Sequence, residues 1–264
     1  MEKSSDITNC GFAAVVKPLK GWVLPIILLV AWELASKQSN AYAQAFVPLG
    51  KIGSSLLEVV LSGELFINLL ASLGTATTGL LIGGVAGLSL GSLMGLYPPA
   101  DKLIGPAFHA VRQVPLLGWI PLIGLWFGNG SLAKTLVVCL AAFYPMVLNT
   151  YEGLRNVEKN HLEAGAVLGV SRWQSYRYIL IPGALPFVFT GIFHALAFSW
   201  ISTVGSELLF STGPGLGGLM QRAQMAARMD IVIICVASIG VTGLLMNFVF
   251  TGFSRHLLRW RAIR

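Results

Sequence analysis

The sequence predicts an all-α, polytopic membrane protein with six transmembrane helices. Apolar residues make up 55% of the 264 residues and charged residues only 11%, with a mean hydropathy of +0.74. A soluble domain carries about 25% charged residues. The apolar residues also gather in long runs, as membrane helices of about 20 residues require. Composition therefore excludes an ordinary soluble domain.

Six runs have the length and composition of a membrane span. They are residues 21–39, a stretch within 65–97 that has no formal charge, 103–128, 135–151, 186–208 and 231–254. Pro106, Pro115 and Pro121 interrupt the third run and predict a broken helix, because proline removes a backbone donor. We expect one membrane domain over residues 21–254, between a segment of residues 1–20 and a basic tail of residues 255–264.

Lysine and arginine are distributed unequally over the connecting segments, which predicts the orientation. With the N-terminus inside, twelve cations are cytoplasmic, namely Lys3, Lys17, Lys20, Lys102, Arg155, Lys159, Arg172, Arg177, Arg255, Arg259, Arg261 and Arg264. Five are external, namely Lys37, Lys51, Lys134, Arg222 and Arg228. Both termini are thus expected in the cytoplasm. The basic tail is then a topology anchor, and no nucleic-acid partner is expected.

The cytoplasmic loop of residues 152–182 is the most polar part of the chain. Val157–Leu168 can form a short helix, with Gly169 where a helix end favours a left-handed residue. Ser171 and Gln174 have the spacing of a capping box, and Pro182 is expected to stop the second helix or kink it. These signals predict a helix-turn-helix outside the bilayer that docks on a partner.

Glycine recurs at every fourth position of the second span, at Gly79, Gly83, Gly87, Gly91 and Gly95. Small residues at this spacing form a groove that lets another helix approach closely. The second helix could belong to the same subunit, which we favour, or to another copy.

Apart from Lys37 near the end of the first run, Arg112 is the only cation inside a predicted span, at a cost of at least about 2.5 kcal/mol at the bilayer centre. It should face the bundle interior or a pathway, unless it reaches the inner surface by snorkelling. Glu207 is expected at the outer surface, either paired with Arg222 or Arg228 or solvated. His194 stands in apolar surroundings that favour a packing role. The full set of pathway or gate candidates is Arg112, Gln113, Pro115, Leu117, Pro121, His194, Ser199 and Glu207.

Sequence signatures of enzymes are absent. There is no zinc-protease motif, no nucleophile elbow and no phosphate-binding loop, and Cys10, Cys139 and Cys235 have no metal-ligand spacing. We therefore expect neither catalysis nor a metal site. Energy for any uphill transport must come from another chain or an ion gradient.

The cytoplasmic loop resembles a known family. The pattern Glu-Ala-Ala, three residues, Gly, nine residues, Ile-x-Leu-Pro marks the permease subunits of binding-protein-dependent ABC importers. This chain keeps every spacing in Glu163–Gly165, Gly169 and Ile179–Pro182, and departs only at Gly165 for Ala and Ile181 for Leu. Residues 112–128, 181–186 and 207–217 are similar to the nitrate/sulfonate/taurine branch, and the resemblance spans residues 22–260.

The resemblance implies a type I ABC importer permease fold with a cytoplasmic coupling helix in the bacterial inner membrane. It implies a second permease copy, two cytoplasmic ATPases that bind ATP and Mg, and an extracytoplasmic substrate-binding protein, with no cofactor on this chain. The coupling residues would be Glu163, Ala164, Gly165, Gly169, Ser171, Arg172 and Trp173.

Among substrates, the resemblance favours an aliphatic sulfonate, with taurine, nitrate or bicarbonate as alternatives. A secondary transporter would instead show an inverted repeat and intramembrane acids, and a membrane-embedded enzyme would need paired catalytic groups in a span.

Overall fold

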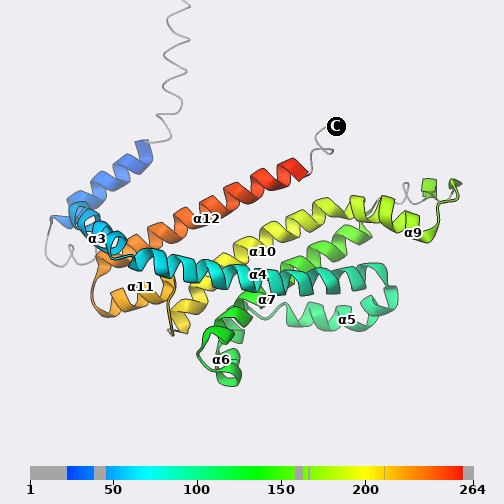
Figure 1. Ribbon diagram of the computed structural model, residues 1–264, viewed down its shortest axis with the longest axis horizontal. Coiled ribbons are helices and arrows are strands. Elements are labelled where there is room, and N and C mark those ends of the chain that lie inside the picture. Colours follow the sequence, from blue (N-terminus) through cyan, green and yellow to red (C-terminus); the bar gives the residue numbers. More distant parts are fainter. Residues whose placement is uncertain (1–22, 39–45, 158–162, 166, 211, 258–264) are drawn as a thin grey trace, which may run out of the picture.

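Two long helices, α4 (Glu64–Leu96) and α7 (Ser131–Arg155), form the centre of the molecule, and α10 (Ile181–Leu209) packs against both (Figure 1). The computed structural model describes residues 23–38, 46–157, 163–165, 167–210 and 212–257. The described residues form helices and turns without a strand, so the predicted all-α class is confirmed.

The glycine groove of α4 packs within the chain, as favoured above. A Cβ on Gly83 would lie 2.9 Å from the backbone carbon and Cα of Cys139, and one on Gly91 would lie 2.6 Å from the carbonyl oxygen of Val147. Both partners belong to α7. The two helices therefore approach so closely that side chains larger than hydrogen do not fit between them.

Within the part of the chain that the structure describes, four helices are long and apolar enough to cross a membrane: Glu64–Leu96, Ser131–Arg155, Arg172–Leu209 and Met229–His256. The bent pair α5–α6 raises the number to five, and the apolar helix Val23–Ser36 is shorter than a full span. The last of the four corresponds to α12 (Met229–Leu257), which runs beside α10 in Figure 1. These helices match the predicted runs in order, although the first run is helical over only 14 residues.

The third predicted span is two helices rather than one interrupted helix. α5 (Pro98–Val111) and α6 (Leu116–Phe127) meet at 93° across a turn of four residues. Pro115 is the residue just before α6, whereas Pro106 and Pro121 lie inside helices that continue past them. The bend therefore occurs at only one of the three prolines.

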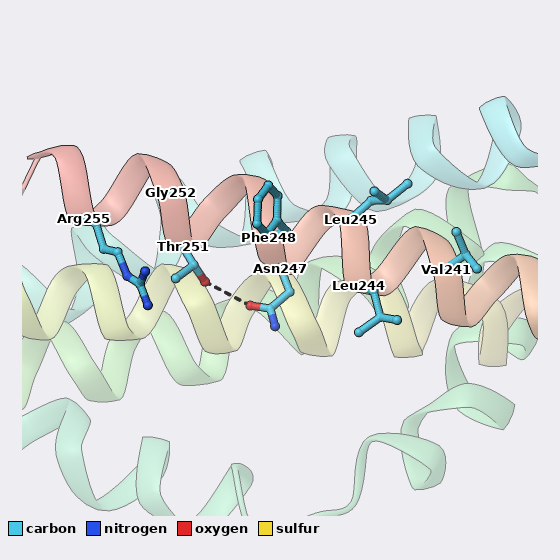
Figure 2. Close-up of a pocket in the computed structure, with 8 residues that line it drawn as sticks. All are labelled: Val241, Leu244, Leu245, Asn247, Phe248, Thr251, Gly252 and Arg255. Atoms are coloured by element: carbon cyan, nitrogen blue, oxygen red, sulfur yellow. Dashed lines mark hydrogen bonds between the residues drawn. The ribbon is translucent and has the colours of Figure 1, made fainter. Parts of the chain in front are cut away.

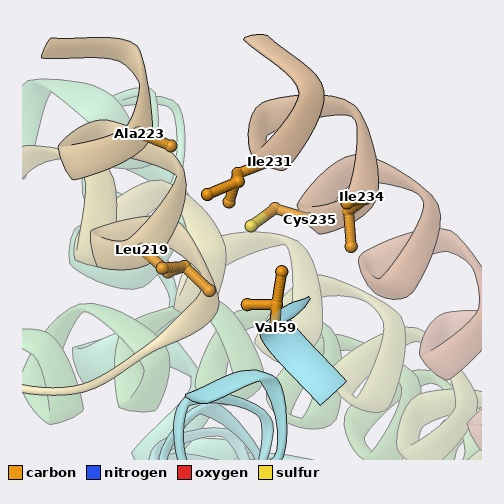
Figure 3. Close-up of a cluster of buried hydrophobic side chains, with 6 residues drawn as sticks. All are labelled: Val59, Leu219, Ala223, Ile231, Ile234 and Cys235. Carbon is orange, nitrogen blue, oxygen red and sulfur yellow. The ribbon is translucent and has the colours of Figure 1, made fainter. Parts of the chain in front are cut away.

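At one end of the molecule, α3 (Leu49–Leu61) and α11 (Leu216–Met225) pack against the start of α12. Their contact is an apolar cluster that Figure 3 shows, made by Val59, Leu219, Ala223, Ile231, Ile234 and Cys235. Cys235 is buried in this cluster. The segment that carries the capping box lies at the opposite end in Figure 1.

Parts of three predictions fall outside the described residues. They are the N-terminal segment of residues 1–20, residues 258–264 of the basic tail, and residues 158–162 and 166 of the first predicted loop helix.

Candidate functional site

The turn in the loop of residues 152–182 has the local geometry that its sequence predicts. Gly169 has φ +73°, in the left-handed region. The Ser171 hydroxyl accepts a hydrogen bond from the backbone N–H of Gln174 at 3.3 Å, and the Ser171 N–H donates to the side-chain oxygen of Gln174 at 2.9 Å. This capping box starts α9 (Arg172–Ser175) and satisfies backbone donors that the helix leaves free.

Large apolar side chains around this turn are exposed, although they lie outside the long apolar part of any span. The exposed fractions are 67% for Trp173, 88% for Val167 and 81% for Leu168. Trp173 stacks on Tyr176 at a centroid distance of 5.8 Å. An open groove beside them is lined by Leu96, Tyr97, Val170, Arg172, Trp173, Ser175, Tyr176 and Leu180. Exposed aromatic and aliphatic groups next to a groove are typical of a protein interaction site.

The stop that the sequence predicts at Pro182 does not occur. A helix of 38 residues runs from Arg172 to Leu209, and Pro182 lies in the first turn of its α10 part. Tyr176–Leu180 forms a π-helical turn, η1, directly before Pro182. A π-helical turn changes the local hydrogen-bond pattern, so that backbone carbonyls left free by proline's missing N–H can find other donors. The turn is thus continuous with the long apolar helix α10.

Gly165, the departure from the family pattern, is buried beneath Ile179. A Cβ on Gly165 would lie 2.8 Å from the Cδ1 atom of Ile179. An alanine at this position would therefore require the isoleucine side chain to move, whereas glycine leaves room for it.

Arg112 lies in the turn between α5 and α6 and is half-buried. Its Nε donates a hydrogen bond to Nδ1 of His109 at 3.1 Å. Gln113, Pro115 and Leu117 follow it with exposed side chains. The cation is therefore at a break in the helix rather than in the middle of a continuous span.

The position predicted for Glu207 is wrong. Its side chain is fully buried, and its partners are neither Arg222 nor Arg228. Both carboxylate oxygens accept from the Ser72 hydroxyl, at 2.8 and 2.9 Å, and one accepts from the Gly217 N–H at 2.9 Å. Gly217 lies in the first turn of α11, where the helix dipole favours a negative charge.

Two residues of α4 complete this buried polar cluster, and the sequence analysis missed both. Ser72 accepts from the N–H of Leu216 at 2.9 Å, and Asn68 accepts from the N–H of Gly215 at 2.8 Å. Three successive backbone donors at the start of α11 are thereby satisfied. Asn68 and Ser72 are four residues apart within an apolar run, which places both on one face of a helix. This spacing was the signal that could have identified them from the sequence.

The two arginines expected to pair with Glu207 form ion pairs with other acidic residues. Arg222 lies 3.9 Å from Glu64, and Arg228 forms ion pairs with Asp230 at 2.8 Å and with Glu58 at 2.9 Å. Hydrogen bonds to Asp230 and Glu58 raise the pKa of Arg228 above the usual value for arginine. These pairs tie α3, α4, α11 and α12 together at the same end as the Glu207 cluster.

The remaining pathway candidates do not converge in this chain. Ser199 is buried and its hydroxyl has no partner among the described residues, whereas His194 is exposed on α10 and thus not the packing residue expected. Pro121 is exposed on α6. A separate open groove follows one face of α12, as Figure 2 shows, and contains none of the candidates. No hydrogen bond among the described residues links the α5–α6 turn to His194 or Ser199.

Comparisons with known proteins agree with the resemblance of the loop. The family profile described as "Binding-protein-dependent transport system inner membrane component" matches residues 79–262. The chain is 31% identical to the permease SsuC of Bacillus subtilis, named for transport of aliphatic sulfonates, over 92% of this chain and 88% of that one. It is 30% identical to the taurine transport system permease protein TauC of Escherichia coli, over 90% and 87% of the two chains.

Two further matches extend these comparisons. The nitrate import permease protein NrtB of Leptolyngbya laminosa is 28% identical over 84% of this chain and 81% of its own. A crystal structure of an amino acid ABC transporter superposes with a TM-score of 0.65 at 18% identity, over 76% of this chain and 97% of that one, which supports the fold. The chain therefore belongs to the inner-membrane permeases of binding-protein-dependent ABC importers, in the branch of the sulfonate, taurine and nitrate permeases, and is a non-catalytic, multi-pass subunit.

Proposed function

We propose that this permease forms the translocation pathway for a small oxyanion, with an aliphatic sulfonate as the first choice. The observation that carries this choice is the 31% identity to a permease named for aliphatic sulfonates along nearly the full length of both chains. Relatives named for taurine, nitrate and bicarbonate make those anions the alternatives.

The charges of the described residues favour an anion over a cation. Glu207 is occupied by Ser72 and Gly217, and Asp230 by Arg228 and Ser55, so neither buried acid is free to hold a cation. Arg112, in contrast, donates one side-chain hydrogen bond among the described residues, to His109. Its remaining guanidinium donors have the forked geometry that suits a sulfonate or nitrate.

The pathway runs between two copies of the chain. The exposed positions of Gln113, Leu117 and His194 support this, because their side chains are open in a single chain and need a second surface to enclose a route. The binding protein delivers substrate at the end that carries α3 and α11.

The turn Gly169–Trp173, with Glu163–Gly165, docks on a cytoplasmic ATPase that binds ATP and Mg. Two such subunits serve the permease pair. The exposed Trp173, Val167 and Leu168 support this role, as does the continuity of the turn with α10. Both termini lie in the cytoplasm in this proposal, and the distribution of lysine and arginine supports that orientation.

The test is ATP hydrolysis by the complex in lipid vesicles with its own binding protein. An alkanesulfonate should stimulate hydrolysis, and nitrate or a neutral sugar should do so much less. Stimulation by nitrate, taurine or bicarbonate alone would move the assignment to that anion. Stimulation by a cation or a neutral solute, with none by any oxyanion, would refute the substrate class.

A further inference from the structure

A polar cluster near the inner end of the molecule connects α5 to α7. Arg155, the last residue of α7, lies 2.5 Å from a carboxylate oxygen of Asp101 in the first turn of α5. The same oxygen accepts from the Tyr151 hydroxyl at 3.1 Å, and Arg155 donates to that hydroxyl at 2.5 Å. We name Asp101, Tyr151 and Arg155 the inner polar cluster.

One side of this cluster is joined to the docking loop. Arg155 ends the helix from which the loop departs, and the loop returns through α9 and η1 into α10. The two ends of the loop are packed tightly. A Cβ on Gly153 would lie 3.2 Å from the Ala184 carbonyl oxygen, and one on Gly183 would lie 3.1 Å from Val157. A displacement of the loop therefore moves the end of α7 and the start of α10 together.

The other side of the cluster is joined to the helix bend. α5 runs from Asp101 to the turn that holds Arg112, and apolar packing of Phe108 with Met94 and Val147 holds it against α4 and α7. The ring of Tyr151 is part of this packing. The inner polar cluster thus joins the base of the docking loop to the helix that leads to Arg112.

We propose that Asp101, Tyr151 and Arg155 are positioning residues that transmit movement of the docking loop through α5 to the α5–α6 turn. The charged pair with its shared hydroxyl adds directional, charge-assisted hydrogen bonds between α5 and α7 to this apolar packing. This inference rests on the proposed function, because it requires an ATPase to move the loop. It adds the residues by which that movement reaches the turn.

The experiment uses the complex purified through a tag on this chain and reconstituted with its binding protein. Transport per ATP hydrolysed is measured for Arg155→Ala, for Asp101→Ala and for the exchanged pair Asp101→Arg with Arg155→Asp. Each single variant should lower this ratio about fivefold or more, since coupling energies are of this order. The exchanged pair should recover much of the loss. Lys37→Ala is the control, because its ion pair with Glu33 is also at the surface but does not touch α5.

A second readout separates transmission from a structural role. In a Gln113→Cys background, the rate of labelling by a small polar thiol reagent should differ between ATP-bound and nucleotide-free complexes. Arg155→Ala should abolish that difference, whereas a merely structural change would lower the amount of folded complex and leave the difference in place. If Arg155→Ala does not insert, Tyr151→Phe keeps the ring and removes one hydroxyl, and should reduce the difference partially.

The outcomes also distinguish this inference from the proposed function. If the unaltered complex shows neither transport nor a nucleotide-dependent labelling rate, the proposed function fails. If the unaltered complex shows both, and Arg155→Ala and Tyr151→Phe behave as Lys37→Ala does, the inner polar cluster transmits nothing and only this inference is refuted.

Discussion

Replacing Gly83 by alanine tests the close packing of α4 on α7. The added methyl carbon would lie 2.9 Å from two backbone atoms of Cys139. Backbone atoms in a helix cannot turn aside as a flexible side chain can, so α7 would have to shift. Overpacking of this kind costs about 1–3 kcal/mol, and the upper end applies here.

Alanine also favours a helix over glycine by up to about 1 kcal/mol. The expected net loss of unfolding free energy for Gly83→Ala is therefore about 2 kcal/mol, roughly a 30-fold decrease in the ratio of folded to unfolded protein. Gly84→Ala is the matched control. It is the next residue of the same helix, and its added carbon meets only a Met146 side-chain atom at 4.0 Å. It should leave stability unchanged or raise it by up to about 1 kcal/mol.

The assay is denaturant unfolding of the purified protein in detergent micelles, followed by circular dichroism and tryptophan fluorescence. The two variants carry the same added methyl group at neighbouring positions of one helix. Any effect of the methyl group on micelle binding should therefore be similar in both and cancel in the comparison. Equal midpoints for Gly83→Ala and Gly84→Ala would refute the close approach of the two helices.

Two further predictions concern the polar sites. Glu207→Ala leaves the Ser72 hydroxyl and the Gly217 N–H without their buried acceptor, and should lower the unfolding free energy by about 3 kcal/mol, while Glu207→Gln, which keeps an acceptor, should lower it by less than half as much. Alanine and glutamine variants of equal stability would contradict the hydrogen-bonding account. Ser171→Ala removes the N-terminal cap of α9, which should lower the stability of this helix by about 1 kcal/mol. The backbone amide of Gln174 should then exchange about fivefold faster in hydrogen-exchange mass spectrometry. An unchanged exchange rate would show that the cap does not stabilise the turn.

The features that sequence reasoning found are those encoded by neighbours along the chain. A capping box needs only Ser171 and Gln174, three residues apart, and the left-handed Gly169 needs only the end of a helical pattern. The glycine groove is equally local, because a spacing of four places small residues on one helix face whatever packs there. Long apolar runs predicted the helices for the same reason.

The error at Glu207 concerns a contact between distant residues. Glu207 was assigned to arginines that follow it by fewer than 25 residues, whereas its partner Ser72 lies 135 residues before it. Pro182 was expected to stop a helix or kink it, because proline lacks a backbone donor. This rule does not foresee the π-helical turn that precedes Pro182 in the structure. The three prolines of the third run are equivalent by the same rule, and only Pro115 stands at the bend.

The sequence by itself determined the class of protein, the order of its apolar helices, the form of the turn Gly169–Trp173 and the family to which it belongs. Hydropathy, capping and glycine spacing are properties of short segments, and they act in the same way in any surroundings. Only the tertiary structure decided that α7 fills the glycine groove, that a 93° bend separates α5 from α6, and that Glu207 holds the start of α11. The physical reason is that burial and hydrogen-bond partners depend on which helices meet, and this is settled by packing between residues far apart in the chain.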